Sequence, residues 1–260
     1  MGGFPEQGQY DSLALAQLVR NREVHVWHME LAAPGHVVVR ARHLLAPDEM
    51  ERAIRFRDGP LRDAFVLARA GLRAVLARYA GVAASRIEFE LGAAGKPSLR
   101  LVSSILRFNV SHTSAIAAYA VTLDASVGVD VERMRSRPDY LALAERFFCT
   151  EECADLRQLP DAQREAGFYE CWVRKEAFVK AVGLGLTLPL DSFRVTLRPE
   201  DPPAVRVPAG GPGASGIWTM HAYRPVPDHA GAVAWQGGYR RVRVCRVRSA
   251  SEMLSSAVAE

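Results

Sequence analysis

Apolar residues recur every three or four positions in four stretches of the chain, and this period predicts helices with one buried face. The four stretches are 47–56, 61–79, 140–158 and 164–182. Asp48 and Glu49 lie in the first turn of the first predicted helix, where the helix dipole favours acidic side chains. Gly81 follows the second stretch, and Gly183 and Gly185 follow the fourth, so glycine is expected to end both helices.

Shorter stretches alternate between apolar and polar residues or are rich in β-branched and aromatic residues, and these predict strands. The predicted strands are 24–31, 87–91, 106–112, 115–123, 127–132, 193–197, 218–224, 230–235 and 241–247, with the start of a further one at 37–40. Residues 199–216, which are rich in Pro, Gly and Ala, predict a loop. We expect a mobile leader at 1–10 and a short helix or tail at 251–260.

Two parts of the chain have the same outline. Residues 74–81 and the strand 87–91 parallel residues 177–183 and the strand 193–197. His112 and His229 each precede small residues that enter a strand. This similarity favours an α+β fold in which two similar α/β subdomains form a pseudo-two-fold pair with the active site at their interface. The expected division is an N-terminal subdomain of 11–124 and a C-terminal subdomain of 125–250.

Composition and charge fit a globular protein with an anionic partner. The 260 residues are 49% hydrophobic and 24% charged, which is ordinary for one large domain or two smaller ones. The net charge of +4 favours a phosphorylated cofactor, an acidic protein or nucleic acid, but it does not choose among them. The start of the chain lacks a secretory signal, and no apolar run approaches the roughly 20 residues of a membrane span. We therefore expect no membrane partner and a cytoplasmic location. We also expect a monomer.

The cysteines agree with that compartment. The four are Cys149, Cys153, Cys171 and Cys245. They have no CxxC spacing, and their density is too low for a disulfide framework. Reduced thiols in the cytoplasm are therefore the better interpretation, although Cys149 and Cys153 could share a helix face as half of a metal site.

The strand 127–132 carries the first candidate chemistry. Alternation along the strand sends its three valines into a core and leaves Asp130 and Glu132 side by side on the opposite face. Two neighbouring carboxylates are costly unless a cation neutralises them, and such a pair suits Mg²⁺ with substrate phosphates. Taken alone, the same pattern also fits a strand with a solvated polar face.

The stretch 164–182 adds further charged groups. Glu176 and Lys180 are spaced i,i+4 and share a helix face, so they could complete the acidic site or form an ordinary surface pair. Lys175 lies within an apolar stripe that includes Trp172 and Phe178. Its ammonium must therefore be paired or reach out on its long stem, and a ligand role and a snorkelling role both stay open.

Five blocks of sequence, in this order, resemble the motifs of the Sfp-type 4′-phosphopantetheinyl transferases. The blocks are Gly95-Lys96-Pro97, Asn109-Val110-Ser111-His112, Gly128-Val129-Asp130-Val131-Glu132, Arg146-Phe147-Phe148 and Trp172-Val173-Arg174-Lys175-Glu176-Ala177-Phe178-Val179-Lys180. The resemblance is clear from about residue 47 to residue 197. It implies a pseudo-dimeric α+β fold with a site for coenzyme A and Mg²⁺ between the halves. It also implies transfer of 4′-phosphopantetheine to a serine of an apo acyl- or peptidyl-carrier protein, with release of adenosine 3′,5′-bisphosphate.

The resemblance also implies roles for individual residues. The metal ligands it implies are Asp130, Glu132 and Glu176. The contacts to coenzyme A it implies are Lys96, Ser111, His112 and Lys180, to which we add Lys175 as a candidate and Arg52, Arg62 and Arg69 from a variable region. Catalytic candidates are Glu176, Lys180 and Glu152, and Thr113 is a candidate beside the metal. The identity of the general base stays open between Glu176 and Glu152.

The chemistry of phosphoryl transfer fits these residue types. A serine hydroxyl attacks a phosphoanhydride, so charge on the phosphoryl oxygens must be neutralised and the leaving group stabilised, a role that Lys180 suits. Two other classes of function remain: a Mg²⁺-dependent nuclease that uses Asp130 and Glu132, and a basic nucleic-acid-binding protein. A nuclease has no evident need for Lys96, Ser111 and His112. The arginines are dispersed along helices with little aromatic interleaving, so we expect no nucleic acid partner.

Overall fold

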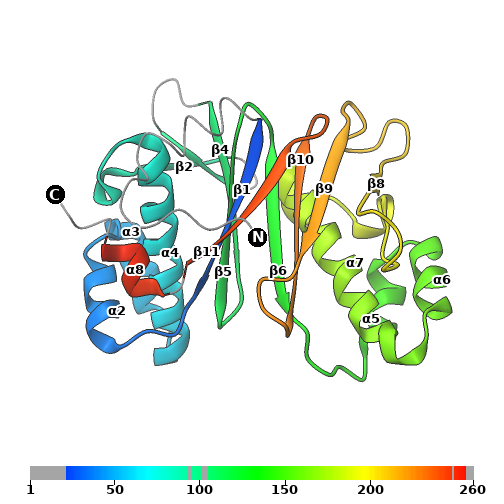
Figure 1. The fold of residues 1–260 in the computed structure, drawn as a ribbon, viewed down its shortest axis with the longest axis horizontal. Coiled ribbons are helices and arrows are strands. Elements are labelled where there is room, and N and C mark those ends of the chain that lie inside the picture. Colours follow the sequence, from blue (N-terminus) through cyan, green and yellow to red (C-terminus); the bar gives the residue numbers. More distant parts are fainter. Residues whose placement is uncertain (1–21, 93–94, 101–104, 248, 256–260) are drawn as a thin grey trace, which may run out of the picture.

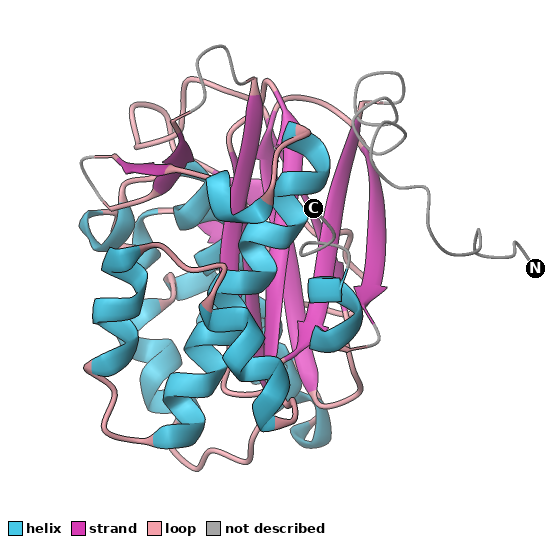
Figure 2. Cartoon of the chain, turned by 90° about the vertical axis from the view of Figure 1, so that its left-hand side faces the viewer, coloured by secondary structure: helices cyan, strands magenta, loops and turns pink. Residues whose placement is uncertain are grey.

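The structure is a computed structural model that describes residues 22–92, 95–100, 105–247 and 249–255. Two β-sheets lie next to each other at the centre, and helices cover the outer side of each (Figure 1). Figure 2 shows the helices of the first half lying over their sheet. The expected leader at 1–10 and residues 256–260 of the expected tail lie outside the described residues. No helix within the described ranges is long and apolar enough to span a bilayer.

The helices and strands follow one another in two similar series. The first half contains β1 (Glu23–Glu30), α2 (Gly35–Arg42), α3 (Pro47–Ile54), α4 (Gly59–Ala80), a 3-10 turn (Ala84–Arg86), β2 (Phe89–Leu91), β3 (Pro97–Leu99), β4 (Leu106–His112) and β5 (Ile116–Leu123). The second contains β6 (Val127–Arg133), α5 (Tyr140–Phe147), α6 (Thr150–Gln158), α7 (Asp161–Val182), 3-10 turns (Gly185–Thr187 and Leu190–Ser192), β7 (Arg194–Val195), β8 (Val205–Arg206), β9 (Trp218–Tyr223) and β10 (His229–Gln236). The chain ends its described part with β11 (Arg241–Val247) and α8 (Ala250–Ser255).

The two halves repeat one topology. The first sheet contains the order β1-β5-β4, and the second has the order β6-β10-β9. In each half the first strand leads through shorter helices to a helix of 22 residues, then to a two-stranded ribbon and to a final antiparallel pair. The helices α4 and α7 both end at a glycine in the left-handed conformation, Gly81 and Gly183. The predicted pseudo-two-fold pair of α/β halves is confirmed.

Strand β11 departs from the expected division of the chain. It follows β10 of the second half but pairs in parallel with β1, so it extends the first sheet. Helix α8 then packs against α4, with Met253 and Leu254 buried in the first core. Both β11 and α8 therefore lie with the first half, whereas the sequence placed 125–250 in the second half and 251–260 in a tail. Alternation predicts a strand but does not say which sheet the strand joins.

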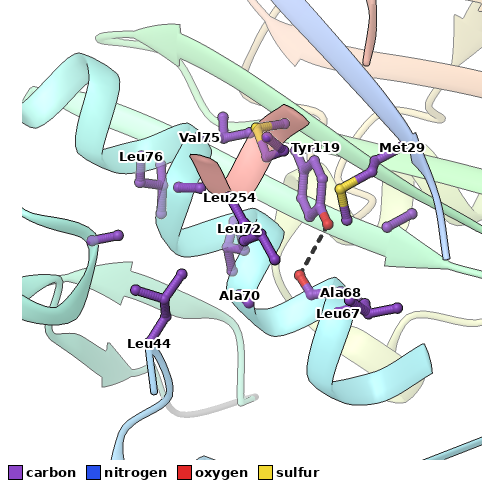
Figure 3. Close-up of a cluster of buried hydrophobic side chains, with 14 of the residues drawn as sticks. Met29, Leu44, Leu67, Ala68, Ala70, Leu72, Val75, Leu76, Tyr119 and Leu254 are labelled. Atoms are coloured by element: carbon purple, nitrogen blue, oxygen red, sulfur yellow. Dashed lines mark hydrogen bonds between the residues drawn. The ribbon is translucent and has the colours of Figure 1, made fainter. Parts of the chain in front are cut away.

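Three apolar cores hold these layers together. The first lies between the first sheet and its helices, where Tyr119 of β5 donates a hydrogen bond to the carbonyl oxygen of Ala68 at 3.0 Å (Figure 3). The second lies between α7 and the second sheet. The third joins the two sheets and includes Val26 of β1 and Val129 of β6. This third core fixes how the halves meet, which decides where the site residues lie.

Two predicted elements are wrong in detail. Residues 37–40 were expected to begin a strand, but they form the middle of α2, because Val37, Val38 and Ala41 face the first core together at helical spacing. Burial outweighs the strand preference of β-branched residues there. The helix expected at 140–158 is two helices, α5 and α6, separated by extended residues at Phe148 and Cys149.

Candidate active site at the seam between the halves

Helix α7 lies directly against β6, and Gly128 makes this close approach possible. A side chain at Gly128 would overlap the carbonyl oxygen of Ala177 and the amide nitrogen of Ala181. Only glycine lets the helix backbone come so near to the strand. The contact brings Lys180 of α7 beside Asp130 of β6.

One carboxylate oxygen of Asp130 accepts hydrogen bonds from both halves. The residue is only 3% exposed, and its Oδ1 accepts hydrogen bonds from Lys180 Nζ at 2.7 Å and from Ser111 Oγ at 2.8 Å. Lys180 also donates to Ser111 Oγ at 2.9 Å. The three side chains, one each from β4, β6 and α7, are thus all hydrogen-bonded to one another. The other oxygen, Oδ2, is buried and has no hydrogen-bond partner among the described residues. Such an oxygen is available to a ligand.

Glu132 and Glu176 extend this acidic group. Burial, with Asp130 and Glu176 nearby, raises the pKa of Glu132 to about 7, and burial together with Asp130 also raises the pKa of Glu176. Within the described ranges no three His, Cys, Asp or Glu side chains form a compact metal site by themselves. The three carboxylates are thus an open set that carries more negative charge than Lys180 balances. This arrangement suits Mg²⁺, which takes one or two carboxylates together with water and substrate phosphates.

Cations gather on the opposite side of the seam. His112 follows Ser111 at the end of β4, and its pKa is lowered by burial of the ring and by the positive charges of Lys180, Arg52 and Arg69. Arg69 is paired with Glu49 through Nε at 2.6 Å, whereas Arg52 is exposed. These side chains form a positive region next to the carboxylates, as a phosphorylated ligand requires.

Arg62 is not part of that positive region. Its nearest acidic partner is Asp63, at 3.6 Å on the same helix, and it is not one of the charges that act on His112. A separate surface cavity of about 600 Å³ opens beside α3 and is lined in part by Arg52 and Phe56. Of the three arginines predicted from the variable region, Arg52 and Arg69 are the two that act on the pKa of His112.

Lys96 reaches across the seam, but its ammonium is already bound. Nζ donates to the carbonyl oxygens of Val127 at 3.0 Å and Ala181 at 3.1 Å, which lie at the start of β6 and near the end of α7. Burial lowers the pKa of Lys96 to about 8. These hydrogen bonds fasten the turn before β3 to the second half, and the contact of the Lys96 ammonium with coenzyme A stays a prediction. A cation at a helix C-terminus is also favoured by the helix dipole.

Lys175 and Glu152 form a buried ion pair away from the seam. Both side chains are fully buried, and Lys175 Nζ lies 2.7 Å from Glu152 Oε2. Lys175 also donates to the carbonyl oxygens of Leu190 and Phe193, and Glu152 accepts the amides of Cys149 and Val195. These contacts favour a structural role for Lys175 and Glu152 over the predicted ligand and base roles, which stay predictions. The pair instead ties α6, α7 and β7 together.

Two further contacts at the seam were not assigned a role from the sequence. Asn109, which is 5% exposed, accepts the backbone amide of Val129 through Oδ1 at 2.9 Å. The buried His229 lies 2.8 Å from Asp228 and 3.5 Å from Thr113 Oγ1 of the other half. The available signal for Asn109 was its position two places before Ser111, which puts both side chains on one face of the strand. Nothing in the sequence pointed to His229 as a partner of Thr113.

Comparison with known proteins identifies the family of the chain. The family model described as the 4′-phosphopantetheinyl transferase superfamily matches residues 126–234. The chain is 34% identical over 217 residues to the 4′-phosphopantetheinyl transferase HetI of Nostoc sp., covering 83% of this chain and 88% of HetI. It is 30% identical over 164 residues to the transferase Sfp of Bacillus subtilis, covering 63% of this chain and 71% of Sfp. The crystal structure of Thermotoga maritima holo-[acyl-carrier-protein] synthase aligns with 44% of this chain and 64% of its own at 19% identity, with a TM-score of 0.35.

An open set of carboxylates beside a positive region is typical of an enzyme that acts on a phosphorylated substrate. The chain belongs to the 4′-phosphopantetheinyl transferase superfamily, and the resemblance stated from its motifs is confirmed. As a member of this family it is a transferase that moves phosphopantetheine from coenzyme A to apo carrier proteins. Of the three classes of function considered from the sequence, the transferase is the one that the comparisons support.

Proposed function

We propose that the seam between β4, β6 and α7 is where this chain transfers phosphopantetheine to a carrier-protein serine. The observation that carries the proposal is the convergence of Ser111, Asp130 and Lys180 from three elements, where one buried oxygen of Asp130 has no hydrogen-bond partner among the described residues. The acidic and cationic groups meet there, and a pyrophosphate needs both a metal and a cation.

Asp130, Glu132 and Glu176 are the residues that would hold Mg²⁺. Two observations support the fit: Oδ2 of Asp130 has no hydrogen-bond partner among the described residues, and the pKa values of Glu132 and Glu176 are raised by burial and by the neighbouring carboxylates. When bound, Mg²⁺ would neutralise charge on the pyrophosphate and polarise the phosphorus under attack. All three side chains offer hard oxygen ligands, as this metal requires.

The remaining residues of the site bind and orient the substrate. His112, Arg52 and Arg69 form the region that would hold the adenosine-bisphosphate end of coenzyme A, because phosphate oxygens are best met by cationic donors. Lys180 would stabilise the charge that develops on the leaving bisphosphate. Of the two candidate bases, only Glu176 lies at the seam, so we assign it the serine proton, directly or through water.

The partner would be an acyl or peptidyl carrier protein, and the enzyme would act as a monomer in the cytoplasm. One chain supplies both sides of the seam, so the site is complete without a second subunit. The cysteines, none of which forms a disulfide in the described residues, suit a reducing compartment. An acidic carrier protein is also favoured by the net charge of +4.

Intact-mass spectrometry of carrier proteins tests this assignment. Purified acyl and peptidyl carrier domains are incubated with coenzyme A, Mg²⁺ and either the wild-type enzyme or Asp130→Asn. We expect the wild-type enzyme to add one phosphopantetheinyl group to a serine of at least one carrier, and chelation of Mg²⁺ to stop the reaction. Asp130→Asn should add far less under the same conditions. Full activity of Asp130→Asn with folded protein would show that the seam is not the reaction site.

A further inference from the structure

We propose that Asn109 is a positioning residue of the active site: it holds β6 so that Asp130 presents its unpartnered oxygen to the metal. The inference rests on the proposed function of the seam for its activity measurement. Asn109 does not touch the carboxylates, and it acts through the backbone of β6.

The strands β4 and β6 meet at the edge of their sheets without forming a ladder. Strand β4 is the outer strand of the first sheet, beside β5, and β6 is the outer strand of the second, beside β10. Among the described strand pairings there is no main-chain pairing between β4 and β6, although the two strands pack against each other. Asn109 connects the two strands instead, because its side-chain Oδ1 on β4 accepts a hydrogen bond from the main-chain amide of Val129 on β6 at 2.9 Å.

This contact is buried, so its loss has a structural consequence. Asn109 is 5% exposed and Val129 is fully buried. A buried amide that loses its acceptor costs about 1–3 kcal/mol, and water cannot replace the acceptor unless the strands move apart. Without Asn109, the strand β6 would therefore shift away from β4 or open toward solvent at Val129.

The position of Val129 connects this shift to the metal site. Val129 directly precedes Asp130, and Ser111, two residues after Asn109 on the same face of β4, donates to Asp130 Oδ1. One strand thus fixes both the backbone before Asp130 and one oxygen of its carboxylate. The second oxygen, Oδ2, is buried and accepts no hydrogen bond from the part of the chain that the structure describes. A metal ligand must be held within about 0.5 Å of its productive position, which two contacts from one rigid strand can achieve.

Asn109→Leu tests the proposal, because leucine has a similar size but no acceptor. Tyr119→Phe is the matched control, since it also removes one buried hydrogen bond, to Ala68 at 3.0 Å, but in the core of the first half (Figure 3). The first measurement is amide hydrogen exchange of Val129 in the free protein. The second is binding of Mn²⁺, as a probe for the metal site, by calorimetry without substrate. The third is the dependence of carrier modification on Mg²⁺ and on coenzyme A.

We expect Asn109→Leu to speed exchange at Val129 by about tenfold or more, the ratio that corresponds to about 1.4 kcal/mol. It should weaken Mn²⁺ binding and raise the Mg²⁺ concentration for half-maximal rate by about the same factor, with little change in KM for coenzyme A. Tyr119→Phe should change none of these quantities. Unchanged exchange at Val129, or equal metal affinity in the two variants, would overturn the inference. If the wild-type enzyme modified no carrier, the exchange and Mn²⁺ measurements would still decide the role of Asn109.

Discussion

At the scale of single residues, Lys180 has two roles that are usually separate. Its ammonium neutralises Asp130 at 2.7 Å, and in the proposed reaction it also stabilises the leaving bisphosphate. For Asp130 and Glu132 we propose a single role, which is to hold the metal. Substitutions at Lys180 and at Glu132 should therefore fail in different ways.

Lys180→Met should lower kcat by about a hundredfold or more, because the cation is needed most as charge develops on the leaving bisphosphate. Glu132→Ala removes one hard ligand, so raised Mg²⁺ or added Mn²⁺ should restore part of its activity. The measurement is turnover at increasing metal concentration for both variants. Equal rescue of the two would contradict this division of roles.

Lys175→Met should act on stability and not on chemistry. It leaves Glu152 charged and fully buried with two backbone amides as its remaining partners, and breaking such a pair costs about 3–5 kcal/mol. Denaturant unfolding should show this loss, while kcat per folded molecule, determined at low temperature, should stay close to that of the wild type. A large fall in kcat with unchanged stability would instead support a role for Lys175 and Glu152 in the reaction.

At the scale of elements, the distance between α7 and β6 sets the geometry of the site. Gly128→Ala places a methyl group against the backbone of Ala177 and Ala181, so the helix must move away from the strand. The shift should carry Lys180 and Glu176 away from Asp130, and activity should fall by about tenfold or more. Gly35→Ala is the control, because the added methyl group at the start of α2 meets no atom within 4 Å. Both variants should be compared by turnover and by melting temperature; equal behaviour of the two would show that the close approach is not required.

Sequence alone predicted the elements that have a long or regular pattern. The helices α4 and α7 and the strands β4, β5 and β6 were expected within a few residues of their bounds, because each keeps one period over its whole length. The α2 segment was wrongly predicted to begin a strand, because its helical conformation depends on burial of its apolar side chains against the first core. The site was less predictable: the spacing of Asp130, Glu176 and Lys180 indicated shared faces, but the partners of Lys96, Lys175 and Asn109 lie far away in the sequence. The residues next to each of them in the sequence do not indicate these contacts.

At the scale of the whole molecule, the protein has a buried histidine in its first sheet that couples folding to pH. His28 of β1 is 6% exposed, and neither ring nitrogen has a hydrogen-bond partner in the described part of the chain. Burial, with a smaller effect of Arg246, lowers its pKa from 6.5 to about 4, against an opposing effect of Glu30. The unfolded chain therefore binds this proton at a higher pH than the folded protein does.

Stability should consequently fall as the pH drops from about 6.5 to about 4, and this part of the loss should be absent above pH 6.5. The difference between pKa values of 6.5 and about 4 corresponds to about 3 kcal/mol in full. His28→Leu should remove that part of the pH dependence without removing the part due to carboxylates. Denaturant unfolding of both proteins at several pH values between 4 and 7 provides the comparison. Parallel curves for the two proteins would show that His28 is not the group responsible.

The return of β11 to the first sheet has a consequence for the order of events during synthesis. The strand β1 lacks its neighbour on one side until residues 241–247 have left the ribosome, and α4 lacks α8 until a few residues later (Figure 1). The first half therefore cannot complete its sheet while the second half is being made, and its open edge must wait through more than a hundred residues of translation. Such a chain should complete its first half only after its second, and a nascent chain arrested before Arg241 should expose the edge of β1 to proteases and chaperones.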